Sequence, residues 1–325
     1  MALFKRKIDL SSDTTTGFGT NSEYSAGRFF NRQTGTANVI KRGVGLLNRH
    51  SWYHTMLAMP RGKFLILLLS IYILINIFFA GIYYLIGIEH LAGVHQGSSY
   101  KNFTEVFFFS AQTFTTVGYG RISPVGFLAS AVSTFEAFLG LLSFALATGL
   151  FYGRFSRPQA FLRFSDNALI APYKEGIALM MRMAPYKNNI LSEIQAKVNL
   201  AMQVEENGKM ANKFYNLDLE ISKINSLSLS WTLVHPINEK SPLYNFSYTD
   251  MVNANIEALV FVQAFDEVFS NTVIQRYSYI ASEIVWGAKF IIMYHPDADK
   301  KKTVLQINKL NEFEKVDLPT TITAT

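Results

Sequence analysis

Two long apolar stretches constrain the fold more than any other feature of this sequence. Residues 64–88 contain no charged side chain, and residues 127–153 contain only Glu136. At about 1.5 Å of rise per residue, a helix over either stretch exceeds the roughly 30 Å hydrocarbon thickness of a bilayer. The sequence therefore predicts two membrane spans that enclose a shorter connecting segment, residues 89–126.

The distribution of basic residues predicts the orientation of these spans. Basic residues are retained on the cytoplasmic side of a membrane, and the connecting segment contains only Lys101 and Arg121. The basic residues that flank the spans are Lys41, Arg42, Arg49, Arg61, Lys63, Arg154, Arg157 and Arg163. We therefore expect a multi-pass protein of the cell (inner) membrane with both termini in the cytoplasm.

The composition argues against several other classes of protein. The absence of cysteine excludes disulfide frameworks, thiolate metal sites and cysteine nucleophiles. Charged residues make up 17% of the chain and the mean hydropathy is +0.15, which fits a part-membrane, part-soluble protein. The net charge of +6 does not indicate nucleic-acid binding, because the bases concentrate beside the spans. No constellation of nucleophile, base or metal ligands is recognisable, so we expect neither an enzyme nor a bound cofactor.

After Pro158 the sequence takes on the pattern of β-strands. Residues 226–233 alternate polar and apolar side chains, which is typical of a half-buried strand. The other β-rich runs are residues 256–265, 288–294 and 303–307. Several short strands at this spacing predict a β-sandwich.

We expect five segments along the chain. They are a cytoplasmic N-terminal tail (1–45), an interfacial helix (46–60), a pore domain (61–153), a linker (154–165) and a cytoplasmic β-sandwich (166–325). The interfacial helix is predicted from Trp52, Tyr53, Met56 and Leu57. Their helical spacing, just before Pro60, suits a helix that lies on the bilayer surface.

The segment between the spans contains a short predicted helix. Asn102 and Glu105 form an N-cap and N3 pair, and residues 103–114 follow as a largely apolar helix that is too short to cross a bilayer. A segment that enters the membrane and returns must bury its non-helical backbone or use it, because lipid offers no hydrogen bonds.

Residues 116–120 supply such a use, because their sequence Thr-Val-Gly-Tyr-Gly is the one known from potassium-selective filters. Rings of backbone carbonyls there replace the hydration shell of K⁺, the expected permeant ion. Gly118 and Gly120 permit backbone torsions that other residues resist. The Thr116 hydroxyl can add a further ring of ligands, and the Tyr119 ring is expected to brace the filter against the short helix. We expect K⁺ at Thr116, Val117, Gly118 and Tyr119. One loop supplies one edge of each ring, so the motif predicts a homotetramer.

Further stretches of the chain carry a family resemblance. They are Phe107-Phe108-Phe109-Ser110, Gln112-Thr113, Thr148-Gly149-Leu150, Arg154-Phe155-Ser156-Arg157-Pro158, Leu229-Ser230-Trp231-Thr232, His235-Pro236-Ile237, Lys240-Ser241-Pro242-Leu243 and Glu283-Ile284-Val285-Trp286-Gly287. With the filter, they resemble the inward-rectifier potassium channels, in particular the prokaryotic branch, over residues 28–317.

The resemblance implies a membrane α-helical two-span pore domain with a re-entrant pore helix, followed by a cytoplasmic all-β, immunoglobulin-like sandwich that tetramerises. It implies one gate at Tyr152, where the inner helices cross, and another at a cytoplasmic loop, residues 264–271, that includes Ala264 and Phe265. An interfacial aromatic anchor is the alternative role for Tyr152. Gly149 is expected to be a hinge or a close-packing point.

Two positions depart from the family pattern. Phe144 occupies the place in the cavity where strong rectifiers carry an acidic or amide residue, which implies weak rectification there. Gln112 occupies a position where many relatives carry a Glu that pairs with a base beyond the filter, so that ion pair is not expected.

Glu136 is the one charge inside a span and is expected to be buried against a partner near the filter, so Glu136 and Gln112 are candidates for filter support.

Basic residues at the cytoplasmic leaflet are candidate ligands of anionic lipid, each gaining about 1 kcal/mol. They are Arg49, Arg61, Lys63, Arg154 and Arg157. The resemblance implies a response to phosphoinositide head groups, and a role in topology alone is the alternative. Intracellular Mg²⁺ or polyamines are further candidate partners of the acidic residues Glu205, Glu206, Asp266 and Glu267, whose ordinary interpretation is a solvated face.

Two other functions remain open from the residues. The first is a two-span potassium channel with a Rossmann ligand-binding domain, which the missing glycine fingerprint and the strand-rich C-terminal half oppose. The second is a membrane-anchored β-sandwich adaptor that conducts nothing, which leaves the short helix and the pentad at residues 116–120 unexplained.

Overall fold

The computed structural model describes residues 28–32, 34–43, 45, 51–95, 97–206 and 209–319. Two compact units make up the chain, and each is described by itself. The pore unit is Arg42–Arg157, and the β unit combines Met1–Lys41 with Pro158–Thr325.

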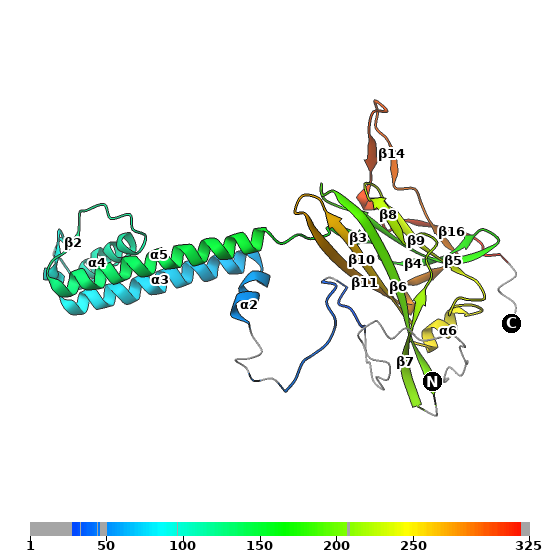
Figure 1. Ribbon diagram of the computed structural model, residues 1–325, viewed down its shortest axis with the longest axis horizontal. Helices are drawn as coiled ribbons and strands as arrows, with labels where there is room; N and C mark the ends of the chain where they lie inside the picture. The colour runs from blue at the N-terminus through cyan, green and yellow to red at the C-terminus, as the bar shows by residue number, and fades with distance from the viewer. Residues whose placement is uncertain are drawn as a thin grey trace. The chain divides into compact units, whose positions relative to one another are not determined.

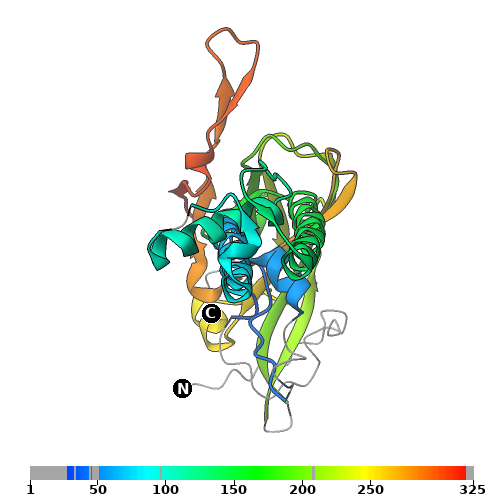
Figure 2. The same ribbon diagram turned by 90° about the vertical axis from the view of Figure 1, so that its left-hand side faces the viewer.

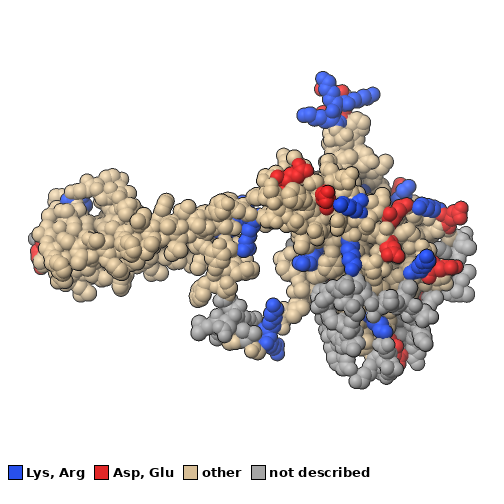
Figure 3. Space-filling view, in the orientation of Figure 1, with Lys and Arg blue, Asp and Glu red and all other residues tan. Residues whose placement is uncertain are grey.

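The described pore unit is built from helices. They are α2 (Trp52–Ala58), α3 (Arg61–Ile86), α4 (Ser99–Phe114) and α5 (Phe127–Phe155). α3 and α5 lie side by side, and the shorter α4 packs against both near one end of the pair (Figures 1 and 2). Both long helices are apolar enough to cross a membrane, with mean hydropathies of 2.6 and 1.6, and their visible surface carries little charge (Figure 3). The two predicted spans are therefore confirmed.

The helix bounds differ from those predicted by a few residues. α3 begins at Arg61 rather than residue 64, because Pro60 is its N-cap, and it ends at Ile86 because Gly87 adopts a positive φ of 112°. α5 continues to Phe155, two residues beyond the predicted end. α2 begins after Ser51, whose hydroxyl accepts a hydrogen bond from the His54 amide; residues 46–50 of the predicted interfacial helix lie outside the described residues.

The predicted start of the pore helix is wrong. α4 begins at Ser99 instead of residue 103, and Ser98 is its N-cap. Asn102 Oδ1 accepts a hydrogen bond from the Gly97 amide at 2.8 Å, so this side chain secures the turn before the helix instead of capping it. The segments on either side of α4 join in a small antiparallel sheet of β1 (Leu91–Ala92) and β2 (Ser123–Pro124).

The β unit is a sandwich of two sheets, which confirms the predicted class. One sheet has the order β11-β10-β6-β7 with β8 paired to β6, and the other has the order β12-β4-β5-β3 with β9 paired to β5. The strands of the first sheet are β6 (Leu191–Glu206), β7 (Lys209–Leu217), β8 (Lys223–Ser226), β10 (Glu257–Asp266) and β11 (Asn271–Ile280). Those of the second are β3 (Leu162–Phe164), β4 (Ala168–Tyr173), β5 (Gly176–Pro185), β9 (Trp231–Ile237) and β12 (Ile284–Trp286).

The sandwich core lies between these sheets. Every second side chain of β6, from Ile194 to Leu200, is buried in it together with residues of β5, β9 and β10. Shorter elements complete the unit: α6 (Tyr248–Asn253), β13 (Ala288–Phe290), β14 (Tyr294–Pro296), β15 (Thr303–Leu305) and β16 (Phe313–Lys315).

Two strand predictions are wrong in detail. The alternating run 226–233 is not one strand, because β8 ends at Ser226 and the chain bends before β9 starts at Trp231. The side chain of Leu227 is buried at this bend, which stabilises it. The run 288–294 is also interrupted, since the Ile291 carbonyl accepts a hydrogen bond from the Arg182 guanidinium.

Arg182 ties the C-terminal segment to β5. Its buried guanidinium donates to the carbonyls of Ile291, Lys309, Leu310 and Glu312 at 2.5–3.2 Å. Burial lowers the pKa of Arg182 to about 10, so it remains a cation at neutral pH. Four carbonyl dipoles thus compensate a buried charge and fix the chain beyond β13.

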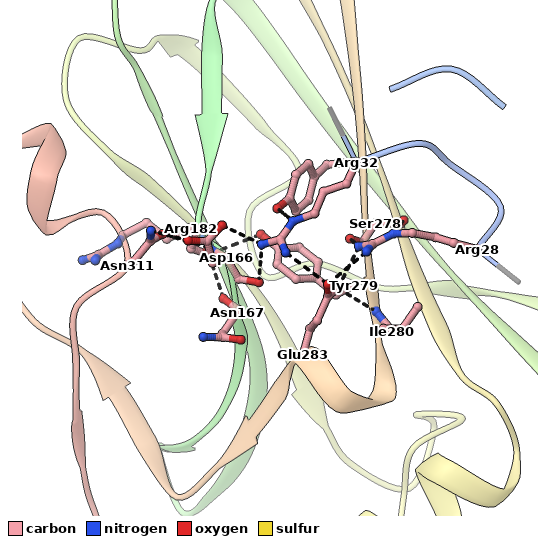
Figure 4. A network of polar contacts seen from close by, with 12 residues as sticks. Arg28, Arg32, Asp166, Asn167, Arg182, Ser278, Tyr279, Ile280, Glu283 and Asn311 are labelled. Atoms are coloured by element: carbon pink, nitrogen blue, oxygen red, sulfur yellow. Dashed lines mark hydrogen bonds and ion pairs between the residues drawn. The ribbon is translucent and has the colours of Figure 1, made fainter. Parts of the chain in front are cut away.

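A segment that precedes α2 in the sequence is also fastened to the rest of the β unit (Figure 4). Arg28 forms an ion pair with Glu283 at 2.7 Å and hydrogen-bonds Ser278, while Arg32 pairs with Asp166 at 2.6 Å and with Glu283 at 3.2 Å. This part of the predicted N-terminal tail therefore has a defined structure.

Candidate ion-conduction site

Gly140 allows α4 to end directly against α5. A Cβ at this position would stand 1.8 Å from the carbonyl oxygen of Phe114, the last residue of α4, so a larger residue does not fit. A hollow of about 670 Å³ beside this end is lined by residues that include Phe114, Thr116 and Phe144. The negative end of a helix dipole next to a hollow favours a cation there over an anion.

The chain turns from α4 into residues 116–120 through hydrogen bonds to the last helical carbonyls. Thr116 donates its amide to Thr113 O at 3.0 Å, and Val117 and Gly118 donate theirs to Gln112 O at 3.0 and 3.3 Å. The inner end of the expected filter is therefore anchored to the pore helix by backbone atoms. Gln112 takes part in this anchor through its carbonyl.

The backbone of residues 116–120 alternates in handedness. Thr116, Gly118 and Gly120 have φ angles of 58°, 50° and 81°, whereas Val117 and Tyr119 are not among the residues of positive φ. In an ordinary strand successive carbonyls point to opposite sides. Reversing the sign of φ at every second residue turns alternate peptides over, which lets consecutive carbonyls face one side. The two glycines take the torsions expected of them, and Thr116 adds a left-handed torsion that is costly for a β-branched residue.

All residues from Thr115 to Gly120 are exposed in the single chain. Val117 is 53% exposed and the Tyr119 ring 80% exposed. The expected packing of this ring against the short helix is thus absent within one chain, and a second chain would have to supply it. An extended backbone without neighbours cannot stand alone inside a bilayer, where unpaired polar groups are costly.

A buried polar cluster joins three helices behind the pore helix. Glu136 of α5 is fully buried and accepts hydrogen bonds from Tyr83 Oη at 2.7 Å and from Ser110 Oγ. Ser110 belongs to α4, and its hydroxyl is also 3.1 Å from Asn76 Oδ1 of α3. This cluster of Tyr83, Glu136, Ser110 and Asn76, called the buried quartet below, holds α4 between the two long helices.

One face of α5 remains exposed toward its C-terminal end. Phe144 and Tyr152 lie two helical turns apart and are 73% and 75% exposed. Gly149 is near this face, and a Cβ there would meet nothing within 4 Å of the single chain. The geometry of one chain therefore leaves both the hinge and the close-packing interpretation of Gly149 open.

The expected cytoplasmic loop is a hairpin between β10 and β11. Ala264 is buried in the sandwich core, whereas Phe265 is 38% exposed and the tip residues Val268 and Phe269 are 67% and 42% exposed. Asp266 is not part of a solvated face, because its buried carboxylate accepts hydrogen bonds from the amides of Val268 and Phe269 at 2.9 and 3.1 Å.

The candidate lipid ligands fall into different environments. Arg61, Lys63 and Arg157 are exposed, and Arg49 lies outside the described residues. Arg154 donates to the carbonyls of Met56 and Met59, the latter at 2.6 Å, and stacks on the Phe64 ring at 4.3 Å. This arginine thus closes the C-terminal end of α2.

Comparison with known proteins decides the family. Residues 162–325 match the profile described as the inward rectifier potassium channel C-terminal domain, and residues 71–157 match the profile described as ion channel. The inward rectifier potassium channel Kirbac3.1 of Paramagnetospirillum magnetotacticum is 34% identical over 86% of this chain and 93% of its own length. The chain belongs to the inward rectifier potassium channel family. The predicted membership and the expectation of an ion channel rather than an enzyme are confirmed.

Animal members of this family are more distant. The inward rectifier potassium channel irk-1 of Caenorhabditis elegans is 26% identical over 79% of this chain and 52% of its own length. The ATP-sensitive inward rectifier potassium channel 12 of Gallus gallus is 27% identical over 71% of this chain and 58% of its own length. The chain spans little more than half of either animal channel.

Several site residues were missed in the sequence. Tyr83 and Ser110 are two of the four members of the buried quartet, and polar side chains inside apolar helices are a usable signal for such partners. Gly140 could be suspected from its small size within a span. The role of Arg154 as a cap of α2 had no sequence signal, since its partners are backbone atoms about 95 residues earlier.

Proposed function

We propose that four copies of this chain form a potassium-selective channel in the cell membrane, with the selectivity filter at residues 116–120. The alternating handedness of Thr116, Gly118 and Gly120 is the observation that carries the proposal. It provides carbonyl oxygens on one side of the backbone, and four such edges replace the hydration shell of a dehydrated K⁺. Both termini and the four β-sandwiches are cytoplasmic.

The proposed gates use two exposed apolar groups. Four Tyr152 side chains close the inner-helix crossing, which the 75% exposure of this residue in one chain supports. The second gate is the β10–β11 hairpin. Because Ala264 is buried, the tip of this hairpin acts through Phe265, Val268 and Phe269, which are exposed.

We also propose weak rectification and regulation by anionic lipid. Phe144 gives the cavity an apolar lining that holds Mg²⁺ or polyamines poorly, because a cation needs oxygen ligands or negative charge. Arg61, Lys63 and Arg157 are free to reach phosphoinositide head groups, whereas Arg154 acts on lipid response indirectly through α2.

Uptake of radioactive rubidium into liposomes tests the conduction. Purified full-length protein is placed in anionic-lipid vesicles that hold a potassium gradient, and uptake is compared with Gly118→Asp and with added barium. Gly176→Asp, a glycine-to-aspartate change at the first residue of β5, where a Cβ would meet nothing within 4 Å, is the matched control.

We expect uptake by the wild type and by Gly176→Asp, and none with barium or with Gly118→Asp. Uptake that persists in Gly118→Asp would overturn the filter assignment. Absence of uptake by an intact wild-type tetramer in vesicles with and without anionic lipid would contradict the proposed conduction.

A further inference from the structure

An ion pair lies at the outer end of the proposed filter. Arg121 directly follows Gly120, and its guanidinium Nη2 is 2.6 Å from Oε2 of Glu105 in the pore helix. The two side chains are 47% and 25% exposed. Oε2 of Glu105 is shielded from water, and within the described part of the chain the Arg121 guanidinium is what compensates it.

The backbone of Arg121 is held from the opposite side. Gly93 approaches so closely that a Cβ there would stand 1.9 Å from the Arg121 carbonyl oxygen. The next residue, Ile122, is buried in a cluster with Val106 and Phe109 of α4. Arg121 is therefore a fixed point between the outer loop and the pore helix.

The outer half of the proposed filter has few other attachments. Its inner residues are anchored by the carbonyls of Thr113 and Gln112. Within the described residues, Tyr119 and Gly120 make no backbone hydrogen bond in the single chain. The position of Gly120 thus depends on what holds the residue that follows it.

We propose that the Glu105–Arg121 ion pair is a positioning pair, which sets the geometry of the outer carbonyl ring and thereby the preference for K⁺ over Na⁺. This inference rests on the proposed filter at residues 116–120. Loss of one partner leaves a partly buried charge uncompensated, which drives the side chain toward water and takes the adjoining backbone with it. A carbonyl ring that widens or tilts loses its match to a dehydrated K⁺.

A charge swap tests the pairing. Rubidium and sodium uptake by liposomes are measured in parallel for Glu105→Gln, for Arg121→Gln and for the double variant Glu105→Arg with Arg121→Glu. Lys101→Gln is the matched control, because Lys101 is an exposed base on the same helix and has no acidic partner among the described residues.

We expect each single variant to lower the ratio of rubidium to sodium uptake by roughly tenfold, and the swapped pair to recover it to within about threefold of the wild type. Lys101→Gln leaves the ratio within about twofold, because it changes the same outer charge without touching the pair. A change of total uptake alone reflects folded yield, whereas the ratio reports on filter geometry.

Each of the other outcomes counts against the pair. If the single variants keep the wild-type ratio of rubidium to sodium uptake, the Glu105–Arg121 ion pair is only a surface contact. If the double variant assembles but stays unselective, the two charges act separately. If the single variants fail to assemble, Glu105→Asp and Arg121→Lys carry the test, and a wild-type ratio in both would overturn the geometric requirement. A wild type without rubidium uptake removes the proposed function, and the pair proposal with it.

Discussion

The buried quartet yields the most quantitative prediction, because Glu136 receives two hydrogen bonds from groups that have no access to water. Replacing Glu136 by Ala leaves the hydroxyl of Tyr83 without its acceptor, whereas Ser110 Oγ can turn to Asn76 Oδ1, which is 3.1 Å away. An unsatisfied buried polar group costs about 1–3 kcal/mol, and the cavity left by the deleted side chain adds to this, so Glu136→Ala is expected to lose the most stability per subunit.

Graded variants separate the individual contributions. Tyr83→Phe removes one donor and leaves one carboxyl oxygen unpaired, with an expected loss of about 1–3 kcal/mol. Glu136→Gln keeps one carbonyl oxygen, and the hydroxyl opposite its amide group can rotate to accept, so we expect the smallest loss, about 1 kcal/mol. Thr134→Ala is the control. The exposed Thr134 hydroxyl lies on the same helix and, within the described chain, hydrogen-bonds only to the backbone carbonyl of Ser130.

The assay is the temperature at which the purified tetramer dissociates in detergent, read by gel filtration after heating, together with the rubidium-to-sodium uptake ratio. The expected order of stability is wild type, Glu136→Gln, Tyr83→Phe and Glu136→Ala, with selectivity falling in the same order because Ser110 stands one and a half helical turns before the filter. A Glu136→Ala channel with the melting temperature and selectivity of the wild type would refute the reasoning.

Three further perturbations have defined outcomes. The added methyl group of Gly140→Ala collides with the Phe114 carbonyl and lowers the stability of the pore unit by about 1–3 kcal/mol or more, so we expect loss of the tetramer in gel filtration. Gly81→Ala is the control and assembles normally, because a Cβ at this position meets nothing within 4 Å. Phe144→Asp places four carboxylates in the cavity, and we expect voltage-dependent block by internal spermine in bilayer recordings that the wild type lacks. Burial lowers the pKa of His235, so this imidazole stays neutral in the folded state while it gains a proton in the unfolded state below about pH 6.5. The stability of the folded state therefore falls as the pH drops through this range, and we expect His235→Gln to reduce the dependence of the thermal unfolding temperature on pH.

The sequence was most informative where the pattern is local. The two spans follow from uninterrupted apolar stretches, and the pentad at residues 116–120 specifies its torsions through Gly118 and Gly120. Local patterns failed where tertiary contacts compete with them. The alternation through Leu227 predicts one strand, but burial of this side chain bends the chain, and Asn102 matches an N-cap although its side chain bonds backward to Gly97.

Contacts between distant segments could not be predicted at all. The pairing of Glu105 with Arg121 depends on how the loop after residue 120 returns to α4, and the capping of α2 by Arg154 depends on how α2 packs against α5. Glu136 could be singled out because a carboxyl group inside a span needs a partner, yet the identity of that partner, Tyr83, becomes evident only when the helices are placed side by side.

The reversal potential of the purified protein in a planar bilayer tests the central claim most directly. With a tenfold potassium gradient balanced by sodium, a potassium-selective filter predicts a reversal potential displaced by about 59 mV toward the potassium equilibrium. A current that reverses near zero under the same gradient would show a pore that does not distinguish the two ions, and would contradict the assignment of residues 116–120 as a selectivity filter.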